Sequence, residues 1–186
     1  GIFEVMVELA SAGLIEPGGL FRPGEAAHRF VQDGQSWKFL LVDRPEQPIY
    51  VKQTDVRAVQ LAKAALSAGV SLLTDYLGCE QFETVYLAGA FGTHLDAKYV
   101  ADIGIIPGAT ADNVVAVGNA AGMGAAMALI NLDEKARIIE AVKHIEKLET
   151  ATEPRFQDYF VAAMTFPTAP QVEGGGGGRG RRRRGG

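Results

Sequence analysis

Two short apolar runs, each followed by a helical pattern, constrain the fold of this chain more than any other feature. Residues 84–92 and 113–119 consist almost entirely of apolar and small side chains, and helical patterns follow at 96–104 and 120–131. Strands that are apolar on both faces are typical of parallel sheets covered by helices. The sequence therefore predicts an α/β fold in which two buried parallel strands lie in one sheet.

The other elements are predicted around this layer. Two strand-like runs at 38–43 and 48–53 predict an inserted hairpin, and the Gly- and Pro-rich stretch before them predicts turns. A long amphipathic pattern predicts a helix that begins at the N-cap Thr54 and ends at Gly78. Three further helices are predicted over 2–12, 132–150 and 154–164.

Charge divides the chain of 186 residues into a body and a tail. Residues 174–186 hold five of the 18 Lys and Arg residues and no acid, so the remainder carries 13 basic and 22 acidic residues. An acidic body argues against a nucleic-acid surface, because phosphate contacts need clustered basic side chains. We expect one domain over 1–167 and a disordered Gly- and Arg-rich tail over 168–186.

The cysteine content and the lengths of the apolar runs indicate the cellular compartment of the chain. The single cysteine, Cys79, excludes a disulfide scaffold and a zinc or iron–sulfur site built only from cysteines of this sequence. The longest apolar run is shorter than the roughly 18 residues that a membrane span needs, and no basic-then-apolar leader opens the sequence. These features predict a cytoplasmic protein that does not contact a membrane.

Small residues at the ends of the two predicted strands are the candidate ligand-binding residues. Ligands of α/β sheets bind beyond the carboxyl ends of strands, where a backbone without side chains can be approached closely. Together the two strand ends could form a wall for a flat ligand. The alternatives are that the glycines serve only a tight turn and that the small residues serve only close packing. The candidates are Ala88, Gly89, Ala90, Phe91, Gly92, Gly118 and Asn119.

Gln60 and Lys63 are two further candidates on the predicted long helix. They are three residues apart and share a polar face with Arg57, so they could reach a ribose or purine across a cleft. The residues alone favour the alternative of a solvated helix face. His94 has no second His or Cys at metal-ligand spacing. Paired carboxylates, a nucleophile elbow and a Walker-type loop are missing from the sequence, which predicts no catalytic or metal-binding residue.

Four stretches, 54–66, 86–96, 103–129 and 160–167, resemble the C-terminal part of the reductive activators of corrinoid proteins. The resemblance covers 1–167. It implies one lobe of an actin/Hsp70/acetate-kinase-like (ASKHA) ATPase, with a mixed sheet flanked by helices and an inserted hairpin. The family uses ATP and Mg²⁺ to reduce a Co(II) corrinoid to Co(I) for methyltransferases, so the implied partner is a corrinoid protein. The family's 2Fe-2S cluster belongs to an N-terminal ferredoxin domain that does not match this sequence.

Residue by residue, the resemblance implies half of a nucleotide site. Leu87 to Gly92 match the adenosine-binding turn, and Gly118 to Ala126 match the start of the connecting helix beneath it. Gln60 and Lys63 match a helix that brings polar side chains to the nucleoside. The two phosphate-binding hairpins and the acid that helps to hold Mg²⁺ have no match. We therefore expect weak nucleoside binding, and no appreciable ATP hydrolysis, from this chain alone.

Two interpretations of another kind stay open. The first is a non-enzymatic interaction module, in which an apolar face left without its partner lobe favours a homodimer or another chain. The second is weak nucleic-acid binding through the Arg-rich tail 174–186, with an artefact of a GC-rich stretch as its alternative.

Overall fold

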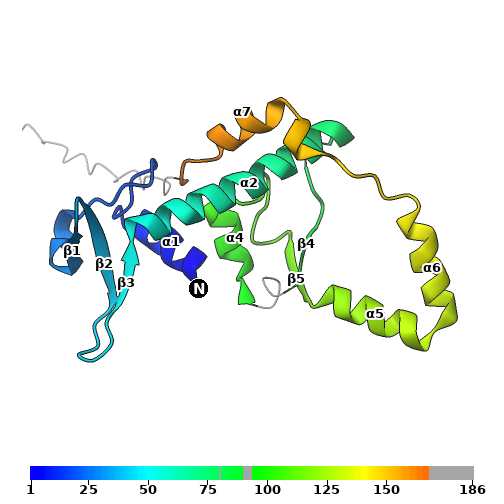
Figure 1. The fold of residues 1–186 in the computed structure, drawn as a ribbon, viewed down its shortest axis with the longest axis horizontal. Coiled ribbons are helices and arrows are strands. Elements are labelled where there is room, and N and C mark those ends of the chain that lie inside the picture. The colour runs from blue at the N-terminus through cyan, green and yellow to red at the C-terminus, as the bar shows by residue number, and fades with distance from the viewer. Residues whose placement is uncertain (80, 90–93, 168–186) are drawn as a thin grey trace, which may run out of the picture.

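A computed structural model describes residues 1–79, 81–89 and 94–167 of the protein. A helix of 25 residues, α2 (Gln53–Leu77), runs between the other elements: α7 lies along one side of it and α1 and α4 lie on another (Figure 1). The remaining helices are α1 (Ile2–Ser11), η1 (Gly24–Arg29), α4 (Ala97–Ile103), α5 (Ala120–Ile130), α6 (Leu132–Val142), η2 (Thr150–Thr152) and α7 (Arg155–Ala162). The strands are β1 (Phe30–Asp33), β2 (Ser36–Val42), β3 (Ile49–Lys52), β4 (Val85–Ala88) and β5 (Val114–Gly118). The mixed α/β fold class is confirmed, and the predicted tail 168–186 lies outside the described residues.

The predicted hairpin is present as part of a larger antiparallel sheet, β1–β2–β3. Strand β1 was not predicted, because only its first residue, Phe30, is buried and no alternation of apolar residues marks it. Phe30 pairs with Phe39 of β2, which also pairs with Val51 of β3. The rings of Phe30 and Phe39 meet edge to face with centroids 5.2 Å apart, so aromatic packing fixes this sheet against the core.

Strands β4 and β5 are parallel, as predicted, but they are not buried on both faces as predicted. Val85 pairs with Val114 and Tyr86 with Val115, and the two strands form a two-stranded sheet among the described residues. Tyr86 is 67% exposed and Val115 is 42% exposed. The prediction of burial was wrong because it assumed helices on both faces. In the described residues, helices cover only the face that carries Leu87.

One hydrophobic core joins the N-terminal part of the chain to its C-terminal end. Phe166 is 3% exposed within this core, and its N–H donates to the carbonyl of Pro17 at 2.9 Å. The C-terminal residues after α7 therefore return to the first elements of the chain. The core residues come from α1, the loop after it, the antiparallel sheet, the first half of α2 and the region of α4: Met6, Val7, Leu9, Ile15, Phe21, Phe30, Phe39, Val51, Val56, Val59, Ile103, Ile105 and Phe166.

Helix α2 begins earlier than predicted and ends where predicted. Its N-cap is Lys52, not Thr54. The Asp55 carboxylate accepts the Lys52 backbone N–H at 2.8 Å, so the N-cap residue has a hydrogen-bond partner within the first turn. It ends at Gly78, whose φ of 64° is left-handed. Within the described residues, α2 alone is long and apolar enough to cross a membrane. Its most apolar window is 44% buried within the protein, where α2 packs against α1 and α7.

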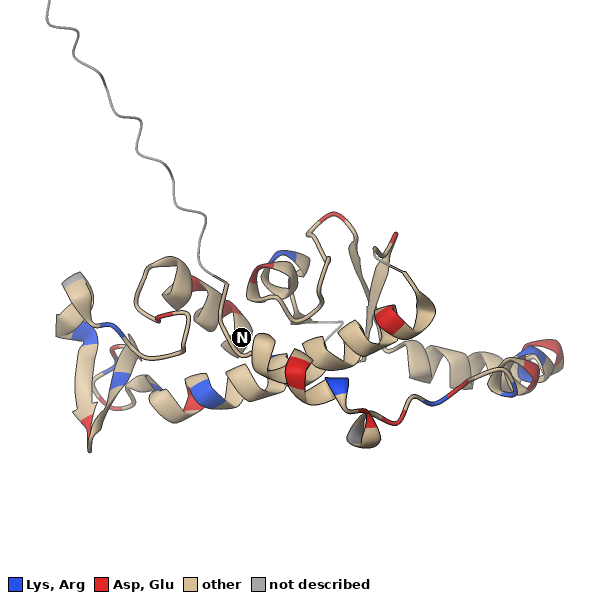
Figure 2. Ribbon diagram, turned by 90° about the horizontal axis from the view of Figure 1, so that it is seen from above, with Lys and Arg blue, Asp and Glu red and all other residues tan. Residues whose placement is uncertain are grey.

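Helices α5 and α6 extend away from the rest of the chain as an arm (Figure 1). Asn131 separates the two helices and caps α6, its side-chain oxygen accepting the N–H of Asp133 at 2.9 Å. Helix α6 ends at Val142, short of the predicted end at residue 150. Neither helix has a buried residue. Charged side chains lie on α6 and none lies on α5 (Figure 2), so α5 exposes an uncharged surface.

Candidate functional site

The ends of β4 and β5 lie side by side, as predicted. The N–H of Gly89 donates to the carbonyl oxygen of Gly118 at 2.7 Å, so the two glycines are in direct contact. Their φ angles are 86° and 62°, which L side chains rarely adopt. Among the described residues, no heavy atom lies within 4 Å of a Cβ atom built on Gly89.

Only part of the predicted Gly-rich turn can be placed. Ala88 ends β4 with an exposed methyl group, while Ala90, Phe91 and Gly92 lie outside the described residues. The described part of the site is therefore a small surface of backbone atoms from Ala88, Gly89 and Gly118. Such a surface can accept a planar ring, and it carries no acid, base or nucleophile of its own.

Asn119 fixes the start of α5 directly after β5. Its side-chain oxygen accepts the N–H of Gly122 at 2.9 Å, which confirms its expected role as an N-cap. A Cβ on Gly122 would lie only 2.6 Å from the Asn119 amide nitrogen, so a glycine is required for this close contact. The cap holds α5 at the edge of the backbone surface.

An apolar cavity of about 240 Å³ lies behind β4. Its lining comes from α1, α2, β4 and the region of α4, and includes Phe3, Leu66, Val70, Leu87 and Val100. Leu87 points into this cavity, whereas its neighbours Tyr86 and Ala88 face outward, as the alternation of a strand requires. The inner face of β4 thus rests on apolar side chains.

Gln60 and Lys63 are buried, so the interpretation of a solvated helix face was wrong. They are 2% and 3% exposed. The Gln60 amide donates to the carbonyl of Met164 at 2.9 Å, and the Lys63 amine donates to that of Ala163 at 2.7 Å. The carbonyls at the C-terminal end of a helix attract hydrogen-bond donors and cations. The Gln60 amide and the Lys63 amine fill this role at the end of α7. No local pattern predicts this partner, because Ala163 is 100 residues away from Lys63.

Burial makes Lys63 a pH-sensitive part of this contact. Loss of hydration lowers the pKa of its amine below the ordinary value of 10.5. The unfolded chain then binds more protons than the folded chain between the lowered pKa and 10.5, so stability rises with pH in this window.

We expect the free energy of unfolding of the native chain, relative to Lys63→Met, to increase as the pH is raised toward the unfolded-state pKa of 10.5. The methionine fills a similar volume and does not titrate. Urea unfolding of both proteins at a series of pH values measures this difference. Parallel stability curves for the two proteins would contradict the assignment.

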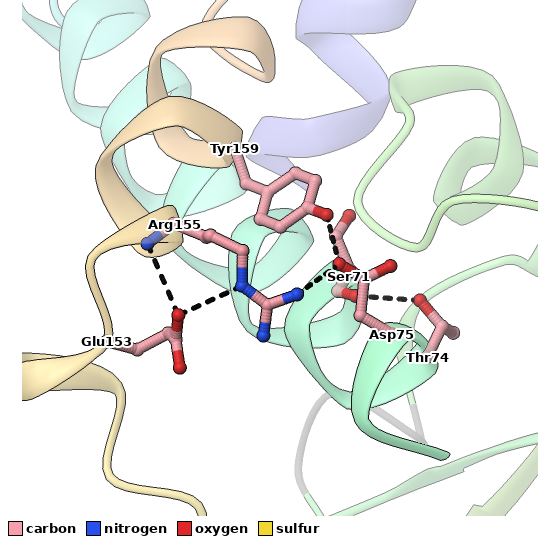
Figure 3. Close-up of polar contacts among 6 residues, drawn as sticks. All are labelled: Ser71, Thr74, Asp75, Glu153, Arg155 and Tyr159. Carbon is pink, nitrogen blue, oxygen red and sulfur yellow. Dashed lines mark hydrogen bonds and ion pairs between the residues drawn. The ribbon is translucent and has the colours of Figure 1, made fainter. Parts of the chain in front are cut away.

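A second polar cluster holds the other end of the contact between α2 and α7 (Figure 3). Asp75 of α2 forms an ion pair with Arg155 at 2.9 Å and accepts the hydroxyl of Tyr159, and Glu153 accepts Arg155 at 3.0 Å. The hydrogen bond to Asp75 stabilises the neutral phenol and raises the pKa of Tyr159. The same principle lowers the pKa of Glu153, whose charged form Arg155 stabilises. All four side chains are partly or largely exposed, and they orient α7 rather than form a site.

The described residues contain no group of three or more His, Cys, Asp or Glu that could hold a metal ion. The described part of the site consists of a flat backbone surface that could accept a ring, the capped helix α5 beside it and apolar side chains behind it.

Comparison with known proteins adds three findings. The family described as the C-terminal domain of RACo, the ASKHA domain, matches residues 1–173. The corrinoid activation enzyme RamQ of Eubacterium limosum is 36% identical in an alignment of 180 residues that covers 89% of this chain and 30% of RamQ. A solved structure of a reductive activator for corrinoid, iron-sulfur protein matches with a TM-score of 0.81 and 26% identity, over 90% of this chain and 28% of that one. The chain thus spans less than a third of the length of both relatives.

Proposed function

This chain belongs to the family of the C-terminal ASKHA domain of RACo, and we propose on this basis that it serves corrinoid activation as the part that binds the adenosine of ATP. Two relatives support the proposed role: one is named a corrinoid activation enzyme and the other a reductive activator. The proposed partner is accordingly a corrinoid protein of a methyltransferase system.

The contact between Gly89 and Gly118 is the observation that carries the nucleotide proposal. It brings two strand ends without bulky side chains into one surface, at the carboxyl edge of parallel strands where α/β proteins bind ligands. No heavy atom of the described residues lies within 4 Å of a Cβ built on Gly89, and we propose that the adenine ring lies on this side of the backbone. Ala88 would contact the base, and Asn119 would keep α5 in place beneath it.

The described residues fit the adenosine better than they fit Mg²⁺. In a nucleotide site this ion is held by one or two carboxylates together with the phosphates, and Ala88, Gly89 and Gly118 carry no carboxylate. Phosphoryl transfer needs such charge around the γ-phosphate. We therefore expect this chain to bind the nucleoside weakly and to show no appreciable ATP hydrolysis alone.

Gly89→Val is expected to weaken ATP binding at least about tenfold, which corresponds to roughly 1.4 kcal/mol. The valine side chain would fill the space that the adenine needs. Isothermal titration of the native and variant chains with ATP measures the effect.

Gly13→Val is the matched control. Gly13 also has a positive φ, of 70°, and also faces open space, but it follows α1. The two variants share the backbone strain, so a difference in affinity reports the site alone. Equal affinities for the two variants would contradict the proposed site, and ATP turnover that Gly89→Val abolishes would contradict the expected lack of hydrolysis.

Exposed apolar side chains favour a second candidate function, a non-enzymatic interaction module. Leu129, Ile130 and Leu132 on the arm are each more than 80% exposed. Large exposed apolar patches are typical of surfaces that bind another protein. Size-exclusion chromatography that shows a clean monomer, together with the absence of binding of a dye for apolar surface, would count against this candidate.

A further inference from the structure

The outward face of the antiparallel sheet β1–β2–β3 carries two positive charges directly opposite each other. Lys38 of β2 and Lys52 of β3 are partners in register, so their side chains share one face of the sheet. Like charges in this position are destabilising. The Lys38 amine lies 4.7 Å from the centroid of the Tyr50 ring, a contact that offsets part of this cost. Neither lysine forms an ion pair with any of the described residues, so both charges are left for an external anion.

A cavity of about 260 Å³ extends this positive surface to the start of α2. Its lining includes Trp37, Lys52 and the α2 residue Arg57, and Asp33 is the one carboxylate among its lining residues. Arg57 is exposed and likewise forms no ion pair within the part of the chain that the structure describes. Trp37 is 41% exposed. Tryptophan and arginine are enriched where proteins bind other proteins, which favours a polypeptide partner.

The charges around this surface limit the kind of partner that it fits. The three cations come from two strands and a helix, so several negative groups are needed to neutralise them. An RNA strand has such groups, but outside residues 174–186 the chain carries 22 acidic and 13 basic residues and repels a long polyanion. A short acidic segment with an apolar side chain among its carboxylates fits both the cations and the indole.

We propose that Trp37, Lys38, Tyr50, Lys52 and Arg57, here called the basic face, form a docking surface for an acidic segment of a partner protein. Carboxylates of the segment pair with the two lysines and the arginine, and an apolar side chain enters the cavity beside the indole. The antiparallel sheet lies at the beginning of α2, away from β4 and β5 (Figure 1). The proposal therefore does not need the nucleotide site to be correct.

The emission of Trp37, the single tryptophan of the chain, reports binding at this face. The probe is an end-blocked pentapeptide in which two glutamates flank a phenylalanine on each side, and its counterpart carries glutamines instead. We expect a saturable change in emission with the acidic peptide and an affinity at least about tenfold lower with the glutamine peptide. Added salt should weaken binding, because exposed charges are screened. The same titration curve for both peptides would overturn the proposal.

Lys52→Glu is expected to weaken binding of the acidic peptide at least about tenfold, because it replaces an attraction by a repulsion within the basic face. Lys135→Glu is the matched control, since Lys135 is exposed on α6 and forms no ion pair among the residues described. Both variants change the net charge equally and keep the Arg-rich tail 174–186, so a difference between them reports the basic face. Equal affinities in the two variants would overturn the proposal.

Two further measurements cover the other outcomes. Arg57→Gln, at an exposed position, is expected to weaken binding in the same direction and replaces Lys52→Glu if that variant does not fold; a native affinity would overturn the proposal. A uridine pentanucleotide tests nucleic acid, and we expect Lys52→Glu to leave its binding unchanged. A loss as large as that of the peptide would assign the face to RNA and overturn the proposal. Trp37 emission that depends on protein concentration without any peptide, and no longer does so in Lys52→Glu, would assign the face to a second copy and overturn it as well.

Discussion

Gly19→Ala is expected to lower the free energy of unfolding by about 2–4 kcal/mol. Gly19 has a φ of 88°, and a Cβ there would lie 2.3 Å from the side-chain oxygen of Gln60. That glutamine is buried and holds the carbonyl of Met164, so it can move only by leaving a buried polar group without its partner. The expected loss combines backbone strain with this broken hydrogen bond.

The neighbouring Gly18 provides the matched control. A Cβ on Gly18 would meet nothing within 4 Å, and its φ is not in the left-handed region. Gly18→Ala is therefore expected to change stability by less than about 1 kcal/mol. Urea unfolding of the two variants measures the difference. Equal effects at the two positions would show that the close approach to Gln60 has no energetic consequence.

Met6→Ala is expected to destabilise the protein by about 2–5 kcal/mol. Met6 is fully buried in α1, within the core that joins this helix to the antiparallel sheet and the region of α4. Truncation removes apolar contacts and leaves a cavity that packed neighbours fill only partly. The loss should appear as a lower midpoint in thermal or urea unfolding.

Ile2 on the same helix separates this core effect from helix propensity. It is 45% exposed, so Ile2→Ala removes little buried surface and replaces isoleucine by a better helix former. We expect a change of less than about 1 kcal/mol for this variant. Comparable losses at Met6 and Ile2 would contradict the assigned position of α1 in the core.

Elements that depend on local pattern were predicted well. The apolar spacing of α1 and α2 and the left-handed cap at Gly78 identified two helices. The apolar runs identified β4 and β5 and their parallel pairing. The short strand β1 was missed, because one inward side chain in four residues leaves no periodic signal.

The candidate site was likewise predicted only in part. The sequence placed Gly89 and Gly118 at adjacent strand ends, because parallel strands share their carboxyl edge, and their hydrogen bond confirms this arrangement. That these glycines bind a nucleoside stays a prediction. The sequence could not identify the partners of Gln60 and Lys63, since the carbonyls that they contact belong to a helix at the other end of the chain.

The sequence by itself determined the type and order of most elements, because backbone propensity, apolar periodicity and glycine caps act within a few residues. Only the tertiary structure decided which surfaces those elements cover. It turned Gln60 and Lys63 inward, to the end of α7, and it left Tyr86 and α5 exposed. Burial depends on contacts between segments that lie far apart in the chain, and no local pattern specifies such contacts.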